Sequence, residues 1–281
     1  MGDSVVTAEM ATEKKDSTKE GGRVVLEIWT SSMVMKLSRE KWVFSGSLLR
    51  NRIPLQRCES QGASWEVDDL MLRRFLRARD LDIEMASAMF LKYLKWRREF
   101  VPKGFISESE VARDLAQDKM FMQGVDKKGR PIVLAIGRKH YPHPEKGGVE
   151  ELKRYVVYVL DKISERMPIG QEKFVGIGDV GGWGYSNCDI RGYIASLSIL
   201  QDYYPERLGK MFLVHVPYIF MAAWKIIYPF IDKNTREKIV FVENKKLKST
   251  LLQDIDESQI PEIYGGKMPL VPIHDISAVP S

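Results

Sequence analysis

The stretch from Tyr203 to Val242 reads YYPERLGKMFLVHVPYIFMAAWKIIYPFIDKNTREKIVFV, and the rest of the chain is organised around it. Pro205 cannot continue a helix, and Gly209 permits a tight turn. Between Gly209 and Pro217 the run from Met211 to Val216 is almost entirely apolar. It therefore predicts a short strand that is buried on both faces inside a sheet.

The residues after this strand predict a helix that is apolar on all sides. Between Tyr218 and Phe230 only Lys225 is charged. A helix of about thirteen residues is roughly 20 Å long, which is too short for the roughly 30 Å of hydrocarbon in a bilayer. Such a helix needs two apolar environments, and we expect protein core on one side and a greasy surface on the other.

Composition limits the classes of function that remain. The 281 residues carry 43 basic and 38 acidic side chains, a net charge of +5. This surplus is too mild for a dedicated nucleic-acid binder, but it suits a surface that meets anionic lipid. Cys58 and Cys188 lie far apart, which predicts a reducing compartment without a disulfide framework. Residues 1 to 20 contain no apolar run, so we expect no signal peptide and no permanent membrane anchor.

The chain divides into four predicted parts. Residues 1–64 form a disordered or poorly structured extension, because neither a helical nor a strand period is sustained there. Its segment 24–64 is either a diverged extension or translated non-coding sequence. Residues 65–115 form a helical subdomain, since Asp68 or Asp69 can cap one helix and Asp82 a second. Residues 116–272 form the main domain, and 273–281 a tail.

The main domain alternates predicted strands with predicted helices. Strands are expected at 119–123, 131–137, 173–179, 211–216 and 239–242, with helices at 149–166 and 190–203. The first two strands flank the turn from Asp126 to Arg130, a hairpin signal, and Ser186 with Asp189 resembles a capping box. This order predicts an α/β fold with a mixed, largely parallel sheet of five to six strands, flanked by helices.

Four motifs resemble those of a known family. They are LRRFLRARDLDIEMASAMFLKYLKWRREF (72–100), DKKGRP (126–131), YYPERLGK (203–210) and IPEIYGG (260–266). In this order they resemble the CRAL-TRIO lipid-binding domain family, and most of all the Sec-fourteen-like phosphatidylinositol transfer proteins in the single-domain form of plants. The resemblance covers residues 67 to 272.

The resemblance implies a function as well as a fold. It implies a helical N-terminal subdomain beside a mixed sheet, around an apolar lipid cavity that a mobile gate helix closes. The gate helix matches residues 218–231, and its apolar members are Phe220, Met221, Trp224, Ile227, Tyr228 and Phe230. We expect a cytoplasmic, monomeric, non-enzymatic carrier that associates reversibly with membranes and exchanges phosphatidylinositol or presents it to lipid kinases. Its ligand would be the bound phospholipid, with no metal or other cofactor and no nucleic acid.

The resemblance also implies four residues that hold the lipid headgroup: Arg79, Glu206, Thr235 and Lys238. Their side chains have the donors and acceptors that a phosphate and inositol hydroxyls require. Thr235 and Lys238 are three residues apart, and on one helix face capped by Asp232 their hydroxyl and ammonium groups converge on a phosphate. Arg79 adds a planar fork of donors, and the Glu206 carboxylate accepts hydrogen bonds from inositol hydroxyls.

Two departures from the family pattern concern the ligand. Asp80 stands where a lysine frequently follows the motif arginine, which weakens the positive field beside the phosphate. Apolar residues replace the polar and aromatic groups of phosphatidylcholine carriers at Met122, Val133, Phe174, Gly176 and Leu200. The second lipid is therefore expected to be less polar than phosphatidylcholine, such as a sterol.

Other interpretations compete with the carrier. The same fold can serve a lipid-gated regulator that binds lipid without transferring it. The gate can be an ordinary buried helix, and the four headgroup residues can be solvated or turn-capping side chains. The run from Gly176 to Gly181 fits the GxGxxG pattern, which suggests a dinucleotide-dependent oxidoreductase. However, its glycines fall in a predicted strand, and the next predicted helix starts too late for its N-terminus to meet a pyrophosphate. His140 and His143 lack a third metal ligand in the sequence and are expected on the surface.

Overall fold

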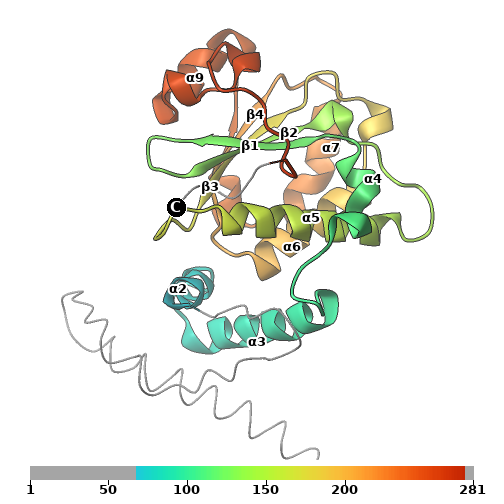
Figure 1. The fold of residues 1–281 in the computed structure, drawn as a ribbon, viewed down its shortest axis with the longest axis vertical. Coiled ribbons are helices and arrows are strands. Elements are labelled where there is room, and N and C mark those ends of the chain that lie inside the picture. Colours follow the sequence, from blue (N-terminus) through green and yellow to red (C-terminus); the bar gives the residue numbers. More distant parts are fainter. Residues whose placement is uncertain (1–67, 276–281) are drawn as a thin grey trace, which may run out of the picture.

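The computed structural model of the chain describes residues 68–275 (Figure 1). The predicted extension over residues 1–64 lies outside the described residues, as does most of the predicted tail. The described part contains one sheet of five strands in chain order, β1-β2-β3-β4-β5. The strands are β1 (Met120–Val125), β2 (Pro131–Ile136), β3 (Phe174–Asp179), β4 (Leu208–Val214) and β5 (Ile239–Phe241).

The direction of the strands confirms the predicted mixed sheet. β1 and β2 are antiparallel, whereas β2, β3, β4 and β5 follow one another in parallel. The hairpin between β1 and β2 turns where the sequence predicts it. The Asp126 carboxylate accepts hydrogen bonds from the backbone N–H groups of Lys128 (3.0 Å) and Arg130 (2.8 Å), and Gly129 takes a left-handed φ of 70°.

The helices surround the sheet. They are α2 (Asp69–Arg77), α3 (Ile83–Phe100), α4 (Ala112–Leu115), α5 (Gly148–Glu165), α6 (Ile190–Tyr203), α7 (Phe220–Ile227), α8 (Lys233–Arg236) and α9 (Leu247–Asp254). Asp68 and Asp82 cap α2 and α3 as predicted, because each carboxylate accepts a hydrogen bond from a backbone N–H of the first turn.

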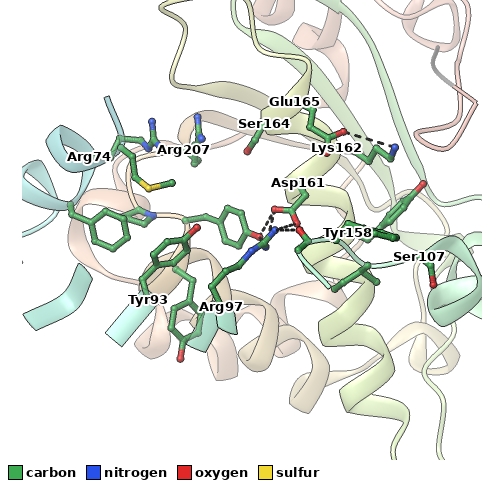
Figure 2. Close-up of a pocket in the computed structure, with 18 of the residues that line it drawn as sticks. Arg74, Tyr93, Arg97, Ser107, Tyr158, Asp161, Lys162, Ser164, Glu165 and Arg207 are labelled. Carbon is green, nitrogen blue, oxygen red and sulfur yellow. Dashed lines mark hydrogen bonds and ion pairs between the residues drawn. The ribbon is translucent and has the colours of Figure 1, made fainter. Parts of the chain in front are cut away.

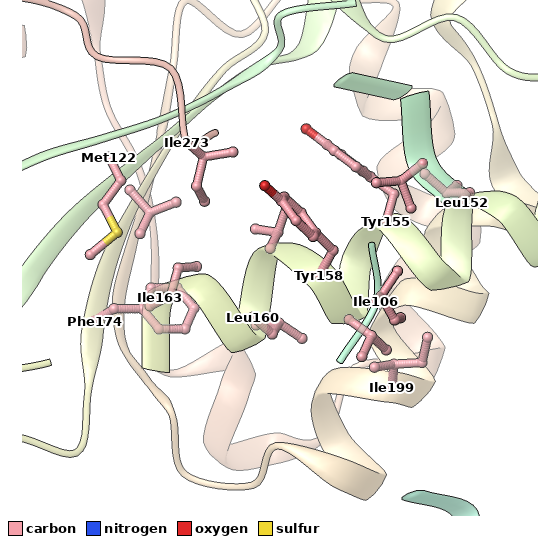
Figure 3. Close-up of a cluster of buried hydrophobic side chains, with 14 of the residues drawn as sticks. Ile106, Met122, Leu152, Tyr155, Tyr158, Leu160, Ile163, Phe174, Ile199 and Ile273 are labelled. Atoms are coloured by element: carbon pink, nitrogen blue, oxygen red, sulfur yellow. The ribbon is translucent and has the colours of Figure 1, made fainter. Parts of the chain in front are cut away.

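Two faces of the sheet bury two different cores. On one face Met122, Val133 and Phe174 pack against α5 and α6, and Figure 3 shows part of this cluster along α5. On the other face the alternate residues of the strands pack against α9 and the C-terminal segment. Because side chains alternate along a strand, Gly176 and Gly178 of β3 lie on the same face as Phe174.

Strand ends differ from the prediction by up to three residues, and those of β4 differ most. β4 begins at Leu208 rather than Met211, because Leu208 already pairs with Phe174 of β3, and it ends at Val214, directly before His215 with its left-handed φ of 53°. The expected capping box of α6 was wrong in part. Asp189 alone caps the helix, accepting from the Gly192 N–H at 2.9 Å, while Ser186 lies in the 3-10 turn Tyr185–Asn187.

The helical subdomain of α2 and α3 joins the main domain through aromatic contacts. Phe75 of α2 packs on Phe90 and Tyr93 of α3. Trp96 of α3 then stacks on Tyr203 at the end of α6, with 3.9 Å between ring centroids. This stack brings the end of the subdomain close to the YYPER motif.

Candidate functional site

The predicted helix within residues 218–231 is present, but its α-helical part is shorter than predicted, and its role as a gate stays a prediction. α7 spans Phe220 to Ile227 and continues as a 3-10 turn from Tyr228 to Phe230. The residues before Phe220 form a hydrogen-bonded turn, and Pro229 has no N–H to donate to the ladder of an α-helix. In the described part of the chain, no helix has the length and apolarity that a membrane crossing requires.

α7 presents apolar side chains to two sides, as the sequence predicts. Phe220, Ala223 and Ile227 form its buried face. On the outer side Ile226 is 54% exposed and Phe230 51%, and Tyr228 is exposed as well. Exposed apolar groups that lie together are typical of a surface that meets lipid or another partner.

The buried face of α7 rests on an aromatic and aliphatic cluster. The edge of the Trp183 ring meets the Phe220 ring at 5.4 Å between centroids, and Val180 and Leu213 complete the cluster. Apolar residues around it keep partial exposure. They are Cys188, Ile190, Tyr193, Met211, Val216, Ile219, Trp224 and Ile239. The closed chamber expected beneath residues 218–231 stays a prediction.

Glu206 and Lys238, two of the four expected headgroup residues, lie in direct contact. The Lys238 ammonium group is 3.3 Å from Oε1 of Glu206. Lys173, directly before β3, donates to Oε2 of the same carboxylate at 3.0 Å. Glu206 itself takes a left-handed φ of 57°, between Pro205 and Arg207. One carboxylate and two ammonium groups therefore form a compact polar site at the start of β4.

These ammonium groups control the charge of the site. Burial favours the neutral form of Glu206, but the hydrogen bond from Lys173 and the charges of both lysines outweigh it and lower the pKa of Glu206 below its ordinary value. Glu206 is thus a carboxylate near neutral pH. Its oxygens are acceptors for hydroxyl groups, and its two lysines are donors for a phosphate.

Thr235 lies three residues before Lys238, in the short helix α8 that follows α7. Asp232 caps α8 as predicted, since Oδ1 accepts from the Thr235 N–H at 2.8 Å and Oδ2 from the Thr235 hydroxyl at 2.6 Å. The expected shared helix face was wrong, because α8 ends at Arg236. Lys238 follows in the connection to β5, where its N–H still bonds the Thr235 carbonyl at 3.1 Å.

Arg79 is not joined to the other three. It lies in the turn after α2, and its guanidinium donates to the carbonyl of Ala78 at 2.7 Å. Within residues 68–275, no hydrogen bond or ion pair links Arg79 to Glu206, Thr235 or Lys238. Its role in headgroup binding stays a prediction.

Lys173 is the site residue that the sequence reading missed. Parallel pairing places Phe174 beside Leu208, so the residues just before both strands lie at one edge of the sheet. Lys173 and Glu206 are therefore neighbours although they are far apart in the chain. The signal was available in principle, because both strands were predicted, but their register was not.

The two histidines of the HxxH pattern do not lie on the surface, so that expectation was wrong. His140 is 8% exposed, and its Nδ1 is 3.0 Å from the Lys119 ammonium group. His143 lies 3.5 Å from Asp114, and ligand atoms of Asp114, His143 and Glu151 fall within 4.8 Å of one another. Their carboxylates are already neutralised by cations, Asp114 by Lys119 and Glu151 by Arg113, so the cluster is explained by ion pairing.

The remaining sequence candidates have structural explanations. Gly176 and Gly178 lie inside β3, where added Cβ atoms would meet Met211 and Leu213 side chains, and the next helix starts only at Ile190. The glycine run is thus not a dinucleotide loop. Burial raises the pKa of the Cys188 thiol, which argues against a reactive thiolate.

Comparisons with known proteins agree on one family. The sequence profile of the family described as CRAL/TRIO domain matches residues 115–266. The SEC14 cytosolic factor of Candida glabrata is 31% identical over 224 residues, which cover 74% of this chain and 74% of that protein. The phosphatidylinositol/phosphatidylcholine transfer protein SFH12 of Arabidopsis thaliana is 33% identical over 214 residues, which cover 70% of this chain and 39% of that protein.

A solved structure shares the fold. The crystal structure of Sfh5 superposes with a TM-score of 0.59 over 76% of each chain, at 21% sequence identity. At that identity the likeness concerns the arrangement of helices and strands alone.

Proposed function

The chain belongs to the CRAL/TRIO domain family, and on that premise we propose that it binds phosphatidylinositol and moves it between membranes. Relatives named as a SEC14 cytosolic factor and as a phosphatidylinositol/phosphatidylcholine transfer protein support a lipid-transfer role. We also propose that the chain breaks no covalent bond and works in the cytosol, with reversible docking on membranes.

The proposal rests on one observation: an apolar helix and a group of polar residues lie close together in one short segment. An apolar helix with a buried and an exposed face, α7, is followed within a few residues by Thr235 and Lys238, and Lys238 contacts Glu206. A lipid has the same two parts. Its acyl chains need an apolar enclosure, and its headgroup needs donors for phosphate and acceptors for hydroxyls.

The energetics explain why a helix of this kind suits a carrier. A diacyl lipid exposes on the order of 30 methylenes, each costing about 0.8 kcal/mol in water. An open groove leaves much of that cost in place. A helix that is apolar on both sides can cover a bound lipid on its inner face and rest on a membrane with its outer face.

The polar site supplies the headgroup chemistry. Lys238 and Lys173 both form ion pairs with Glu206. A phosphate would draw the Lys238 ammonium and the Thr235 hydroxyl to itself. The Glu206 carboxylate would then accept hydrogen bonds from the inositol ring while Lys173 keeps it charged.

Vesicle transfer with single variants tests the proposal. We expect Lys238→Ala and Glu206→Ala to lower the rate of phosphatidylinositol transfer between vesicles about tenfold or more, as expected for loss of a hydrogen bond to a charged group. The matched control is Lys246→Ala. Lys246 is an exposed lysine that follows β5 in the chain and pairs with Glu243. Full transfer by folded Lys238→Ala and Glu206→Ala proteins would remove both residues from the site. Stoichiometric lipid binding by the parent chain without transfer would favour a regulator instead.

A further inference from the structure

A cavity of about 900 Å³ lies between the helical subdomain and the main domain. Its wall comes from α2, α3, the loop after α3, the C-terminal half of α5 and the connection between α6 and β4. Among the described residues that line it, none belongs to α7, α8 or β5. It is therefore distinct from the headgroup and gate residues, although Pro205 and Arg207 in its wall flank Glu206.

Two arginines in the wall of this cavity, Arg74 and Arg207, have positive charges that nearby carboxylates do not fully neutralise. Arg74 is only 5% exposed, and Figure 2 shows its guanidinium beside that of Arg207. Burial, together with the charge of Arg207, lowers the pKa of Arg74 to about 10. Among the described residues, Arg207 donates to two neutral atoms, the sulfur of Met167 and the carbonyl of Glu172, both at 3.2 Å. Within the described range no carboxylate lies at ion-pair distance from Arg207.

The Glu172 carboxylate contacts more than one arginine, so it does not fully neutralise Arg74. Glu172 pairs with Arg77 at 2.9 Å and reaches Arg74 only at 3.6 Å. Asp68 forms no ion pair with either arginine within the described residues, but its negative charge also acts on both Arg74 and Arg207. Three guanidinium groups thus share two carboxylates at this end of the cavity, and a partly buried cation without a partner is unfavourable. An anion in the cavity would correct the imbalance.

The other charged groups of the wall are already satisfied. Arg97 forms a two-pronged pair with Asp161, at 2.7 Å and 3.2 Å, and the Tyr204 hydroxyl donates to the same carboxylate at 2.7 Å. Figure 2 shows Arg97 pointing to Asp161, away from Arg74 and Arg207. The free binding capacity of the cavity is therefore concentrated at Arg74 and Arg207.

The remaining wall is apolar and aromatic. It includes Met71, Phe75, Tyr93, Phe105 and Ile106. Pockets of roughly 300–1,000 Å³ with apolar walls and a few convergent polar groups are typical of small-molecule sites. We propose that this cavity is a second ligand site for a small organic anion, whose phosphate or carboxylate group lies between Arg74 and Arg207 and whose apolar part packs on Phe75 and Tyr93.

This site joins two parts of the fold. Arg74 belongs to α2, whereas Arg207 follows the YYPER proline in the main domain. A bound anion bridges them and fastens the subdomain to the domain. Binding therefore stabilises the protein by mass action and raises its melting temperature as the ligand concentration rises.

Phenyl phosphate is the test ligand, with isothermal titration calorimetry and thermal unfolding of the full chain as measurements. We expect saturable binding and a rising melting temperature, with weaker binding of inorganic phosphate, which lacks the apolar part. Arg74→Gln and Arg207→Gln should each weaken binding at least tenfold, because each removes a charged, two-pronged donor. Arg113→Gln, which alters an exposed arginine paired with Glu145 and Glu151, should bind like the parent chain.

Further readouts separate a ligand site from a structural role. Without ligand, Arg207→Gln should melt at or above the temperature of the parent chain, since it removes an unneutralised charge. Arg207→Lys should bind with intermediate affinity. Absence of saturable binding by the parent chain, or equal binding by Arg207→Gln, would overturn the proposal.

The same titration distinguishes this site from the headgroup site. Protein loaded with phosphatidylinositol should bind phenyl phosphate with unchanged affinity, whereas competition would show that the anion enters the lipid headgroup site and would refute a second site. Arg207→Gln should keep phosphatidylinositol transfer. Loss of transfer in Lys238→Ala and loss of phenyl phosphate binding in Arg207→Gln are therefore independent results.

Discussion

Among single residues, Glu206 is central to the proposed headgroup site, because it pairs with both Lys173 and Lys238. Its left-handed backbone conformation, with φ at 57°, costs on the order of 1 kcal/mol for a residue with a Cβ. Two ion pairs, with Lys173 and Lys238, offset this cost in a partly buried place. A strained backbone conformation that charge pairs sustain is typical of functional sites, and here it supports the proposed headgroup site.

The lowered pKa of Glu206 predicts a pH dependence of stability. The ionised form is favoured in the folded state, so its contribution is present above the ordinary value of 4.5 and is lost as pH falls through the lower folded pKa. We expect Glu206→Gln to be less stable than the parent chain at pH 7, with a difference that shrinks below pH 4.5. Urea unfolding of both proteins at pH 7, 5 and 3.5 measures it. A difference that is the same at all three values would contradict the assignment.

Among the elements, α7 is the one that we propose meets the membrane. Its buried face packs on Trp183 and Leu213, while Ile226 and Phe230 face outward from the exposed side. The segment that follows α7 is attached to α6. Gln201 of α6 accepts from the Asp232 N–H at 2.7 Å and donates to the Phe230 carbonyl at 3.1 Å. Displacement of the segment after α7 would break this pair of hydrogen bonds.

Removal of the outer apolar face should weaken docking. In Ile226→Ser/Phe230→Ser, two half-exposed apolar side chains are lost, each worth on the order of 1 kcal/mol when inserted into lipid. We expect roughly tenfold to thirtyfold weaker association with anionic vesicles in a flotation assay. The matched control is Ile169→Ser, an isoleucine that is fully exposed on the loop between α5 and β3. Equal vesicle binding by the double variant would exclude α7 as the docking surface.

The elements themselves were largely predictable from the sequence. α6 begins and ends at the predicted residues, because Asp189 caps it and Pro205 follows it. α7 and the strands before and after it follow from Pro217, Pro229 and the apolar runs between them. The ends of the strands were predicted less accurately. Leu208 belongs to β4 because it pairs with Phe174 of β3, and such a pairing cannot be inferred from the local sequence pattern.

The side-chain partners were less predictable. Lys173 contacts Glu206 only because β3 and β4 share one register. The burial of His140 follows from Lys119 and Asp189, which come from distant parts of the chain. Tertiary packing decides such contacts, so they lie beyond periodicity and capping rules.

In the molecule as a whole, several ion pairs connect the helical subdomain to the main domain, and two of them differ clearly in burial. Arg97 of α3 and Asp161 of α5 are both mostly buried, whereas Lys92 and Asp202 are exposed. Between them the Trp96 and Tyr203 rings stack. The position of the subdomain over the main domain, and with it the cavity that contains Arg74 and Arg207, depends on these contacts.

The two pairs should differ in their contribution to stability. Asp161→Asn leaves the buried Arg97 without its partner, which should lower the free energy of unfolding by about 3 kcal/mol. Asp202→Asn breaks the exposed pair with Lys92 and should cost at most about 1 kcal/mol. Urea denaturation of both variants provides the comparison. Equal losses would show that Arg97 and Asp161 do not hold the two parts together.

Lipid binding can be observed directly by native mass spectrometry of the full chain after incubation with mixed-lipid vesicles. We expect one phosphatidylinositol molecule per chain, and a strong reduction of that complex in Lys238→Ala but not in Lys246→Ala. A chain that emerges without lipid, or that retains phosphatidylinositol equally well in Lys238→Ala, would contradict it.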